Sequence, residues 1–262
     1  MIGFQAACKI NLYLRVLGKR DDGFHDLDTL FQQINVVDDL LWNPGDEPLS
    51  LEVKGAQLGP VGDNLIVRAF QRVNRELDTP VGGQMVVTKR IPIGGGLGGG
   101  SANAGATLGA INRYLGDRFS RDELVRFAAD LGSDVPFFIE GGCQRGRGRG
   151  ERLEIAVPPH GTPNFGCLVL PPFGISTAEV FRNLVVEAHS KPELGDNDLF
   201  ETALAVEPRL RALDAELRPL AVGPWFMSGS GSTMVHLGAP LDCDLSTTAR
   251  RLGCMVVPFQ FL

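Results

Sequence analysis

The residues best able to do chemistry surround a run of glycines near the middle of the chain. Six glycines occupy the seven positions 94–100. Glycine loses much entropy on folding and packs no side chain, so such a run suits a backbone that needs positive φ and approaches a ligand closely. It lies between an expected strand over 84–91 and an expected helix over 101–115, and free N–H groups at a helix start favour phosphate. The Ser101 hydroxyl adds a donor or a ligand for Mg²⁺.

Other interpretations of the glycine tract are weaker. A Walker A loop would end in Gly-Lys followed by Ser or Thr, and no lysine follows here. Gly94, Gly96 and Gly99 formally match the dinucleotide fingerprint, but the acidic residue at the right distance, Asp117, lies in a loop between two expected helices rather than at the end of a strand. A flexible linker is disfavoured because regular patterns adjoin the tract on both sides.

Three further places carry polar or aromatic side chains. The segment 4–16 alternates apolar and polar residues, which predicts a half-buried strand with Lys9 and Asn11 on one face. Asp134 stands in a Ser-Asp-Val-Pro turn, and Phe24 and His25 follow a turn glycine. Each also has a purely structural interpretation, as a solvated lysine, a turn-forming aspartate or a loop histidine.

The remaining pattern predicts an α+β chain. Asp63-Asn64 starts a helix, and Ser120 with Glu123 forms a capping box for another that Gly132 ends. A new series of predicted strands and helices begins after residue 155. This places a boundary near Pro158-Pro159 and predicts domains 1–157 and 158–262. The second part predicts a strand over 165–170, helices over 177–186 and 208–217, two short strands within 225–237, and a final helix and strand.

Composition limits the partners. The chain has 262 residues, 44% of them hydrophobic, and a net charge of −6, so its surface as a whole should repel nucleic acid and anionic lipid. No apolar run approaches the length of a membrane span, and no secretory signal is recognisable, which predicts a cytoplasmic protein. The five scattered cysteines suggest neither disulfides nor a zinc site.

Several segments of the chain resemble a known family of kinases. The segment 91–104, Ile-Pro-Ile-Gly-Gly-Gly-Leu-Gly-Gly-Gly-Ser-Ala-Asn-Ala, resembles the nucleotide loop of the galactokinase–homoserine–mevalonate–phosphomevalonate (GHMP) kinases. More narrowly, the chain resembles the kinases of 4-diphosphocytidyl-2-C-methyl-D-erythritol. That match is carried by segments 9–12, 23–32, 63–66, 131–137 and 228–232, in the family's order. Phe24, where tyrosine is commoner, and Ala102, where a second serine is commoner, depart from it.

The resemblance implies a two-domain GHMP-kinase fold, with an N-terminal nucleotide domain like domain 2 of ribosomal protein S5 and a C-terminal ferredoxin-like α/β domain. It implies phosphorylation of the 2-hydroxyl of 4-diphosphocytidyl-2-C-methyl-D-erythritol by ATP with Mg²⁺, in non-mevalonate isoprenoid biosynthesis. Lys9 and Asp134 would be catalytic, with Asp134 as general base. The substrate would contact Asn11, Phe24, His25 and Phe181. ATP would contact Asn64, Pro92, Gly94, Gly95, Gly96, Leu97, Gly98, Gly99, Gly100, Ser101 and Ala102.

Two alternatives stay open from the sequence. One is a sister kinase acting on homoserine or a mevalonate-type substrate, although such substrates have no base to stack between Phe24 and Phe181. The other is a silent nucleotide-binding regulator, which would not need both Lys9 and Asp134. The Arg/Gly run over 145–150 is interpreted as a solvated turn or strand edge rather than an RNA-binding element. The metal ligands stay unassigned, and a monomer or weak homodimer is expected.

Overall fold

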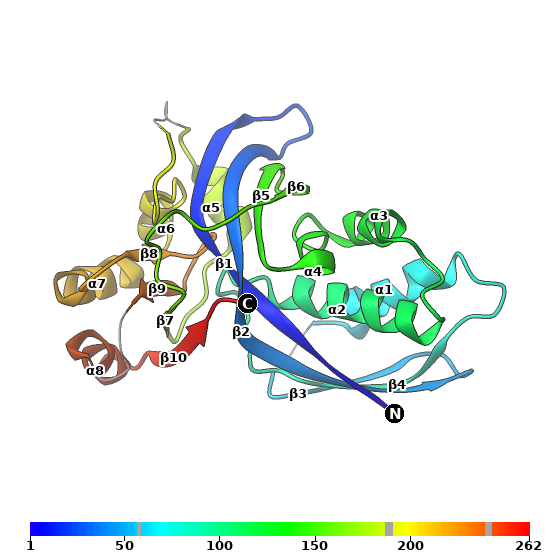
Figure 1. Ribbon diagram of the computed structural model, residues 1–262. Coiled ribbons are helices and arrows are strands. Elements are labelled where there is room, and N and C mark those ends of the chain that lie inside the picture. The colour runs from blue at the N-terminus through cyan, green and yellow to red at the C-terminus, as the bar shows by residue number, and fades with distance from the viewer. Residues whose placement is uncertain (57–58, 187–190, 239–242) are drawn as a thin grey trace. The chain divides into compact units, whose positions relative to one another are not determined.

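The computed structural model describes residues 1–56, 59–186, 191–238 and 243–262 (Figure 1). Their contacts group the chain into two compact units that interleave along the sequence. Unit 1 comprises residues 1–8, 36–91 and 98–141, and unit 2 comprises residues 9–35, 92–97 and 142–262. Two long strands, β1 (Ile2–Lys19) and β2 (His25–Gly45), pass through both units. The division into consecutive domains 1–157 and 158–262 stays a prediction beside this interleaved grouping.

In unit 1, helices cover a sheet. The second half of β2 pairs antiparallel with β4 (Gly82–Thr88), and β4 pairs in parallel with β3 (Ser50–Lys54). Figure 1 shows the helices of this unit together on one side of β3 and β4. They are η1 (Val61–Asp63), α1 (Leu65–Asn74), α2 (Gly99–Tyr114), α3 (Arg121–Leu131) and α4 (Phe137–Glu140).

Local sequence signals account for the helix starts in unit 1. The Asn64 side chain accepts a hydrogen bond from the N–H of Ile66 and caps α1, and the Ser120–Glu123 capping box opens α3 as predicted. Apolar residues at helical spacing then bury one face of α1 and of α3 in a shared core. The shared core contains Trp42, Phe70, Met85, Leu108 and Phe127.

Unit 2 contains an antiparallel sheet in the order β10-β7-β9-β8. Its strands are β7 (Phe165–Leu170), β8 (Trp225–Met227), β9 (Met234–Leu237) and β10 (Met255–Gln260). The helices between them are α5 (Thr177–Asn183), α6 (Phe200–Val206), α7 (Pro208–Leu217), η2 (Arg218–Leu220) and α8 (Asp244–Arg251). Helices follow the first and third of these strands, and the fourth strand pairs beside the first, as in a ferredoxin-like β-α-β-β-α-β unit. The predicted strand 165–170 and helix 208–217 are confirmed.

The first half of β2 also belongs to unit 2, where it pairs antiparallel with β5 (Cys143–Gly148), and β5 pairs with β6 (Arg152–Ile155). The interpretation of the Arg/Gly run as a solvated turn or strand edge is therefore wrong for residues 145–147, which have a strand on each side. Arg145 is held there because its Nε donates to Asp28 at 2.7 Å. That hydrogen bond is the main reason why the pKa of Asp28 lies below its usual value.

Strand β1 differs from its prediction in one respect that matters for the site. The alternation predicted a half-buried strand, but residues 8–14 are buried on both faces. Lys9 is 4% exposed and Asn11 is 2% exposed. A lysine and an asparagine are buried at such a depth only when other groups satisfy their hydrogen bonds. The interpretation of Lys9 as a solvated surface lysine is therefore excluded.

No helix in the parts of the chain that the structure describes is both long and apolar enough to cross a membrane.

Candidate active site

The glycine tract follows β4 of unit 1, and the chain just before the tract is held in place by the buried carboxylate of Asp38. Just before the tract, the main-chain N–H groups of Arg90 and Ile91 donate to one carboxylate oxygen of Asp38, at 2.6 and 2.8 Å. The other oxygen accepts from the ammonium of Lys89, and Asp38 is fully buried. A buried carboxylate with three charge-compatible donors holds the chain rigidly at this point. Sequence reasoning missed Asp38, whose only signal is an acidic residue within an apolar strand.

The tract itself adopts a backbone that side chains would block. Gly94, Gly96 and Gly98 have φ of 71°, 75° and 68°, in the left-handed region that favours glycine. A Cβ on Gly96 would lie 2.3 Å from the carbonyl oxygen of Ser228, and one on Gly95 would lie 2.6 Å from the Thr233 hydroxyl. The glycines are therefore required by their own conformation and by the close approach of residues 228–233.

Helix α2 begins within the tract, at Gly99, and offers its N-terminus without a side-chain cap. Gly98 is the N-cap residue, and no side chain accepts from the first turn. Free N–H groups and the helix dipole at such an end attract phosphate oxygens. Ser101 lies in this first turn and is partly exposed, whereas Ala102 is buried and its N–H donates to Gly98. The free N–H groups of the first turn and the Ser101 hydroxyl are donors of the kind that the predicted phosphate loop requires.

Lys9 is joined to the tract by a direct hydrogen bond. Its ammonium donates to the carbonyl oxygen of Gly96 at 3.0 Å and to the amide oxygen of Asn11 at 2.7 Å. The main-chain N–H of Lys9 donates to Leu97 at 3.1 Å. Ser228 donates to the same Gly96 carbonyl at 3.3 Å. The structure thus brings together two predicted site residues of β1 with the tract, and adds Ser228.

Two of the three aromatic residues predicted for a nucleobase, His25 and Phe181, lie together. The rings of His25 and Phe181 are 5.2 Å apart with an interplanar angle of 33°. Phe24 is 51% exposed, and the guanidinium of Arg149 lies 5.0 Å from the centre of its ring. Burial, and secondarily the charge of Lys19, lowers the pKa of His25 below 6.5, so the imidazole is neutral at pH 7. A neutral imidazole offers one donor and one acceptor to a base edge.

Asp134 and Asn64 belong to unit 1. Asp134 lies in the turn between α3 and α4 and is partly buried. Asn64 caps α1, so its amide oxygen is already engaged at 3.0 Å by the N–H of Ile66. Their predicted roles toward substrate and ATP stay predictions.

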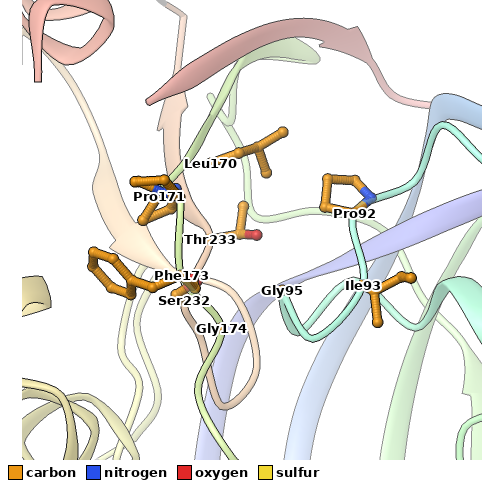
Figure 2. A pocket seen from close by; sticks show the side chains of 10 residues that line it. Pro92, Ile93, Gly95, Leu170, Pro171, Phe173, Gly174, Ser232 and Thr233 are labelled. Carbon is orange, nitrogen blue, oxygen red and sulfur yellow. The ribbon is translucent and has the colours of Figure 1, made fainter. Parts of the chain in front are cut away.

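A small pocket lies beside the tract within unit 2. Its volume is about 200 Å³, and Figure 2 shows Pro92 and Ile93 on one side of it and Leu170, Pro171 and Phe173 on the other. This volume is below the roughly 300–1,000 Å³ of typical ligand sites. We assign it no substrate.

Comparison with known proteins identifies the family to which the chain belongs. The model of the GHMP kinases N terminal domain matches residues 64–142. The 4-diphosphocytidyl-2-C-methyl-D-erythritol kinase of Pelotomaculum thermopropionicum is 38% identical, covering 94% of this chain and 92% of its own length. The enzyme of the same name from Moorella thermoacetica is 44% identical, covering 94% and 91%. This chain belongs to the 4-diphosphocytidyl-2-C-methyl-D-erythritol kinase family.

Solved structures agree with the family and its wider superfamily. A crystal structure of 4-(cytidine 5'-diphospho)-2C-methyl-D-erythritol kinase superposes with a TM-score of 0.82 at 29% identity and covers 99% of both chains. A mevalonate kinase superposes with a TM-score of 0.72 at 13% identity, over 100% of this chain and 99% of its own, which shows a shared fold alone. The predicted α+β GHMP-kinase fold is confirmed. As a member of this family, the chain is a kinase. The roles of its glycine tract and Lys9 in phosphoryl transfer stay predictions.

Proposed function

We propose that this protein transfers the γ-phosphate of ATP to the 2-hydroxyl of 4-diphosphocytidyl-2-C-methyl-D-erythritol, as a step of non-mevalonate isoprenoid biosynthesis. The observation that carries the proposal is the buried Lys9, hydrogen-bonded to the glycine tract at Gly96. A buried ammonium beside a phosphate-binding loop supplies a local positive charge on a chain whose net charge is −6. Family membership supports the same substrate.

The phosphates of ATP are proposed to bind the main-chain N–H groups of the tract and the start of α2. There the positive φ of Gly94, Gly96 and Gly98 shapes the loop, and the close approach of the Ser228 carbonyl leaves no room for a Cβ at Gly96. Pro92 and Asn64 are proposed to flank the nucleotide. Ala102 itself would offer no hydrogen-bond donor to ATP, because its methyl group is buried and its N–H is used within the helix. It would contribute only by packing beside the residues that bind the phosphates.

In the transfer, the 2-hydroxyl oxygen forms a bond to the γ-phosphorus as the bond to the β-phosphate oxygen breaks, and ADP leaves. The hydroxyl proton passes to the carboxylate of Asp134. The ammonium of Lys9 neutralises the charge that develops on the phosphoryl oxygens. Preorganised charge of this kind is usually the largest contribution that a protein makes to such a step.

Magnesium would neutralise the phosphates of ATP when bound. Among the residues that the structure describes, no group of three or more His, Cys, Asp or Glu side chains is arranged to hold a metal ion. This fits a metal that arrives with ATP, because Mg²⁺ in kinases is held mainly by substrate phosphates, water and one or two protein oxygens. The Ser101 hydroxyl, in the uncapped first turn of α2, would be one such oxygen.

Cytosine is proposed to stack on Phe24 and Phe181, with His25 donating to or accepting from its edge. Asn11, whose amide already contacts Lys9, is proposed to orient the acceptor end of the substrate. Stacking contributes about 1–3 kcal/mol per base on each aromatic face, which is enough to select a cytidine substrate over a small alcohol. This distinguishes the proposal from a homoserine or mevalonate kinase.

The deciding experiment measures ATP-dependent phosphorylation of three acceptors by the purified protein. We expect ADP release and a new phosphomonoester signal in ³¹P NMR with 4-diphosphocytidyl-2-C-methyl-D-erythritol, and neither with homoserine or mevalonate. Turnover of mevalonate or homoserine alone would refute the cytidine assignment, and binding of ATP without turnover of any acceptor would favour the silent regulator. A cytoplasmic location and a monomer or weak homodimer are proposed with it, and sedimentation of the purified protein tests the second.

A further inference from the structure

A buried chain of hydrogen bonds continues from Lys9 beyond Asn11. The amide nitrogen of Asn11 donates to the Thr29 hydroxyl at 2.7 Å, and that hydroxyl donates to the carbonyl oxygen of Tyr13 at 2.6 Å. Thr29 is fully buried on β2, and all these residues belong to unit 2. Thr29 therefore lies two hydrogen bonds away from the ammonium of Lys9.

The direction of every bond in this chain is fixed by its two ends. The Tyr13 carbonyl only accepts, so the single Thr29 proton is given to it, and Thr29 can then only accept from Asn11. At the other end a lysine ammonium only donates, so the amide oxygen of Asn11 must face it. Both ends thus require the same orientation of the Asn11 amide, with its oxygen toward Lys9 and its nitrogen toward Thr29.

We propose that Thr29 is a positioning residue for phosphoryl transfer: its hydroxyl fixes the Asn11 amide, and the amide in turn fixes the ammonium of Lys9 beside Gly96. The inference rests on the proposed function, in which Lys9 neutralises the moving phosphoryl group. Without the hydroxyl, the buried NH₂ of Asn11 loses its acceptor. Turning the amide over does not repair the loss, because it would point NH₂ at the ammonium. Asn11 must therefore move, and Lys9 loses one of the contacts that hold it.

Two substitutions separate the hydroxyl from the shape of the side chain. Thr29→Val keeps the branched shape and removes the hydroxyl, and we expect kcat to fall about 10- to 100-fold with the KM for ATP nearly unchanged, as for a misplaced catalytic group. Thr29→Ser keeps the hydroxyl, and we expect it to retain a kcat within about threefold of the native value. Equal losses in the two variants, or native activity in Thr29→Val, would overturn the proposal.

Thr107→Val is the matched control. Thr107 is also fully buried, and its hydroxyl also donates to a main-chain carbonyl, that of Asn103, at 2.7 Å. It lies in the interior of α2, outside the proposed machinery. We expect Thr107→Val to keep the native kcat, so that loss of a buried threonine hydroxyl does not by itself explain the result at position 29.

A double-mutant cycle tests whether Thr29 acts through Asn11. If it does, adding Thr29→Val to Asn11→Ala should lower kcat by less than about twofold further, because the second change removes a contact that is already lost. Independent, multiplicative losses would contradict the proposal even if Thr29→Val alone were poorly active.

Hydrogen exchange of the Asn11 side chain, measured without substrate, tests the positioning role of Thr29 independently of the proposed function. In ¹⁵N-edited spectra the side-chain NH₂ of Asn11 should be protected from hydrogen exchange in the native protein and in Thr29→Ser, and should exchange faster in Thr29→Val. An unchanged exchange rate in Thr29→Val would overturn the positioning role. A native protein with no kinase activity but with this pattern would remove the proposed function and leave the Asn11 orientation established.

Discussion

The ammonium of Lys9 lies 3.0 Å from the carbonyl oxygen of Gly96, although 87 positions separate the two residues in the sequence. Through this contact the first strand and the glycine tract hold one another in place. The ammonium of Lys9 and the glycine tract, which we propose binds the phosphates, are therefore positioned relative to each other before any substrate binds. Such preorganisation is what makes a charged group effective in catalysis, because little reorganisation is left for the reaction itself.

Removing the charge of Lys9 should stop the reaction without unfolding the protein. Lys9→Met keeps the length of the side chain, and an apolar group in place of a buried ion is often tolerated. We expect kcat to fall about 100-fold or more, the size of effect seen when one preorganised donor is lost. Steady-state kinetics measure it, with circular dichroism as the check on folding. Lys54→Met, which removes an exposed surface pair with Glu52, should leave kcat native.

Gly96 should tolerate no side chain. Its φ of 75° and the Ser228 oxygen 2.3 Å from any Cβ require Gly96→Ala to distort the tract. We expect ATP affinity, measured by calorimetry, to fall by tenfold or more, about 1.4 kcal/mol. Gly109→Ala, inside α2 with open space around its Cβ, should instead raise stability by about 0.5–1 kcal/mol. Native ATP affinity in Gly96→Ala would show that this part of the tract does not hold the phosphates.

Phe181 should affect the KM for the cytidine substrate and leave the KM for ATP unchanged. Replacing it by alanine removes one stacking face and the ring contact with His25. We expect the KM for 4-diphosphocytidyl-2-C-methyl-D-erythritol to rise about 5- to 150-fold, the equivalent of 1–3 kcal/mol. The exposed Phe165 on β7 offers a control, since Phe165→Ala should change neither KM. A rise in the KM for ATP alone would show that Phe181 contacts ATP and not the cytidine substrate.

His25 gives the substrate site a pH dependence of defined sign. Burial lowers its pKa below 6.5, so the folded protein favours the neutral imidazole. The contribution of neutral His25 is therefore fully present above pH 6.5 and is lost as the pH falls through the lowered pKa. We expect the KM for the cytidine substrate to stay constant from pH 8 to about 6.5 and to rise in more acidic buffer. His25→Gln should flatten that acidic rise, and a rise toward alkaline pH in the native enzyme would contradict the assignment.

Local signals in the sequence predicted much of the fold. The capping box at Ser120, the cap at Asn64 and the proline at 208 each act on neighbouring backbone, so the helix starts they mark follow from short segments. The glycine tract was recognisable for the same reason, because only glycine suits its alternating positive φ.

Contacts between distant segments were beyond the sequence pattern. The alternation of β1 predicted an exposed polar face, and only the packing of Thr29 and Ser228 against Asn11 shows why that face is buried. The pattern of the Arg/Gly run predicts a solvated turn or strand edge, whereas the ion pair of Arg145 with Asp28 on β2 keeps Arg145 in a strand. The interleaved units have the same origin, since β1 and β2 each contribute to both.

In the proposed mechanism, Asp134 takes the hydroxyl proton during transfer of the γ-phosphate. Asp134→Asn is nearly isosteric but cannot accept that proton. In single-turnover measurements with ATP and 4-diphosphocytidyl-2-C-methyl-D-erythritol, we expect the rate of phosphoryl transfer to fall about 100-fold or more while ATP binding stays within about twofold of native. A native transfer rate in Asp134→Asn would contradict the mechanism.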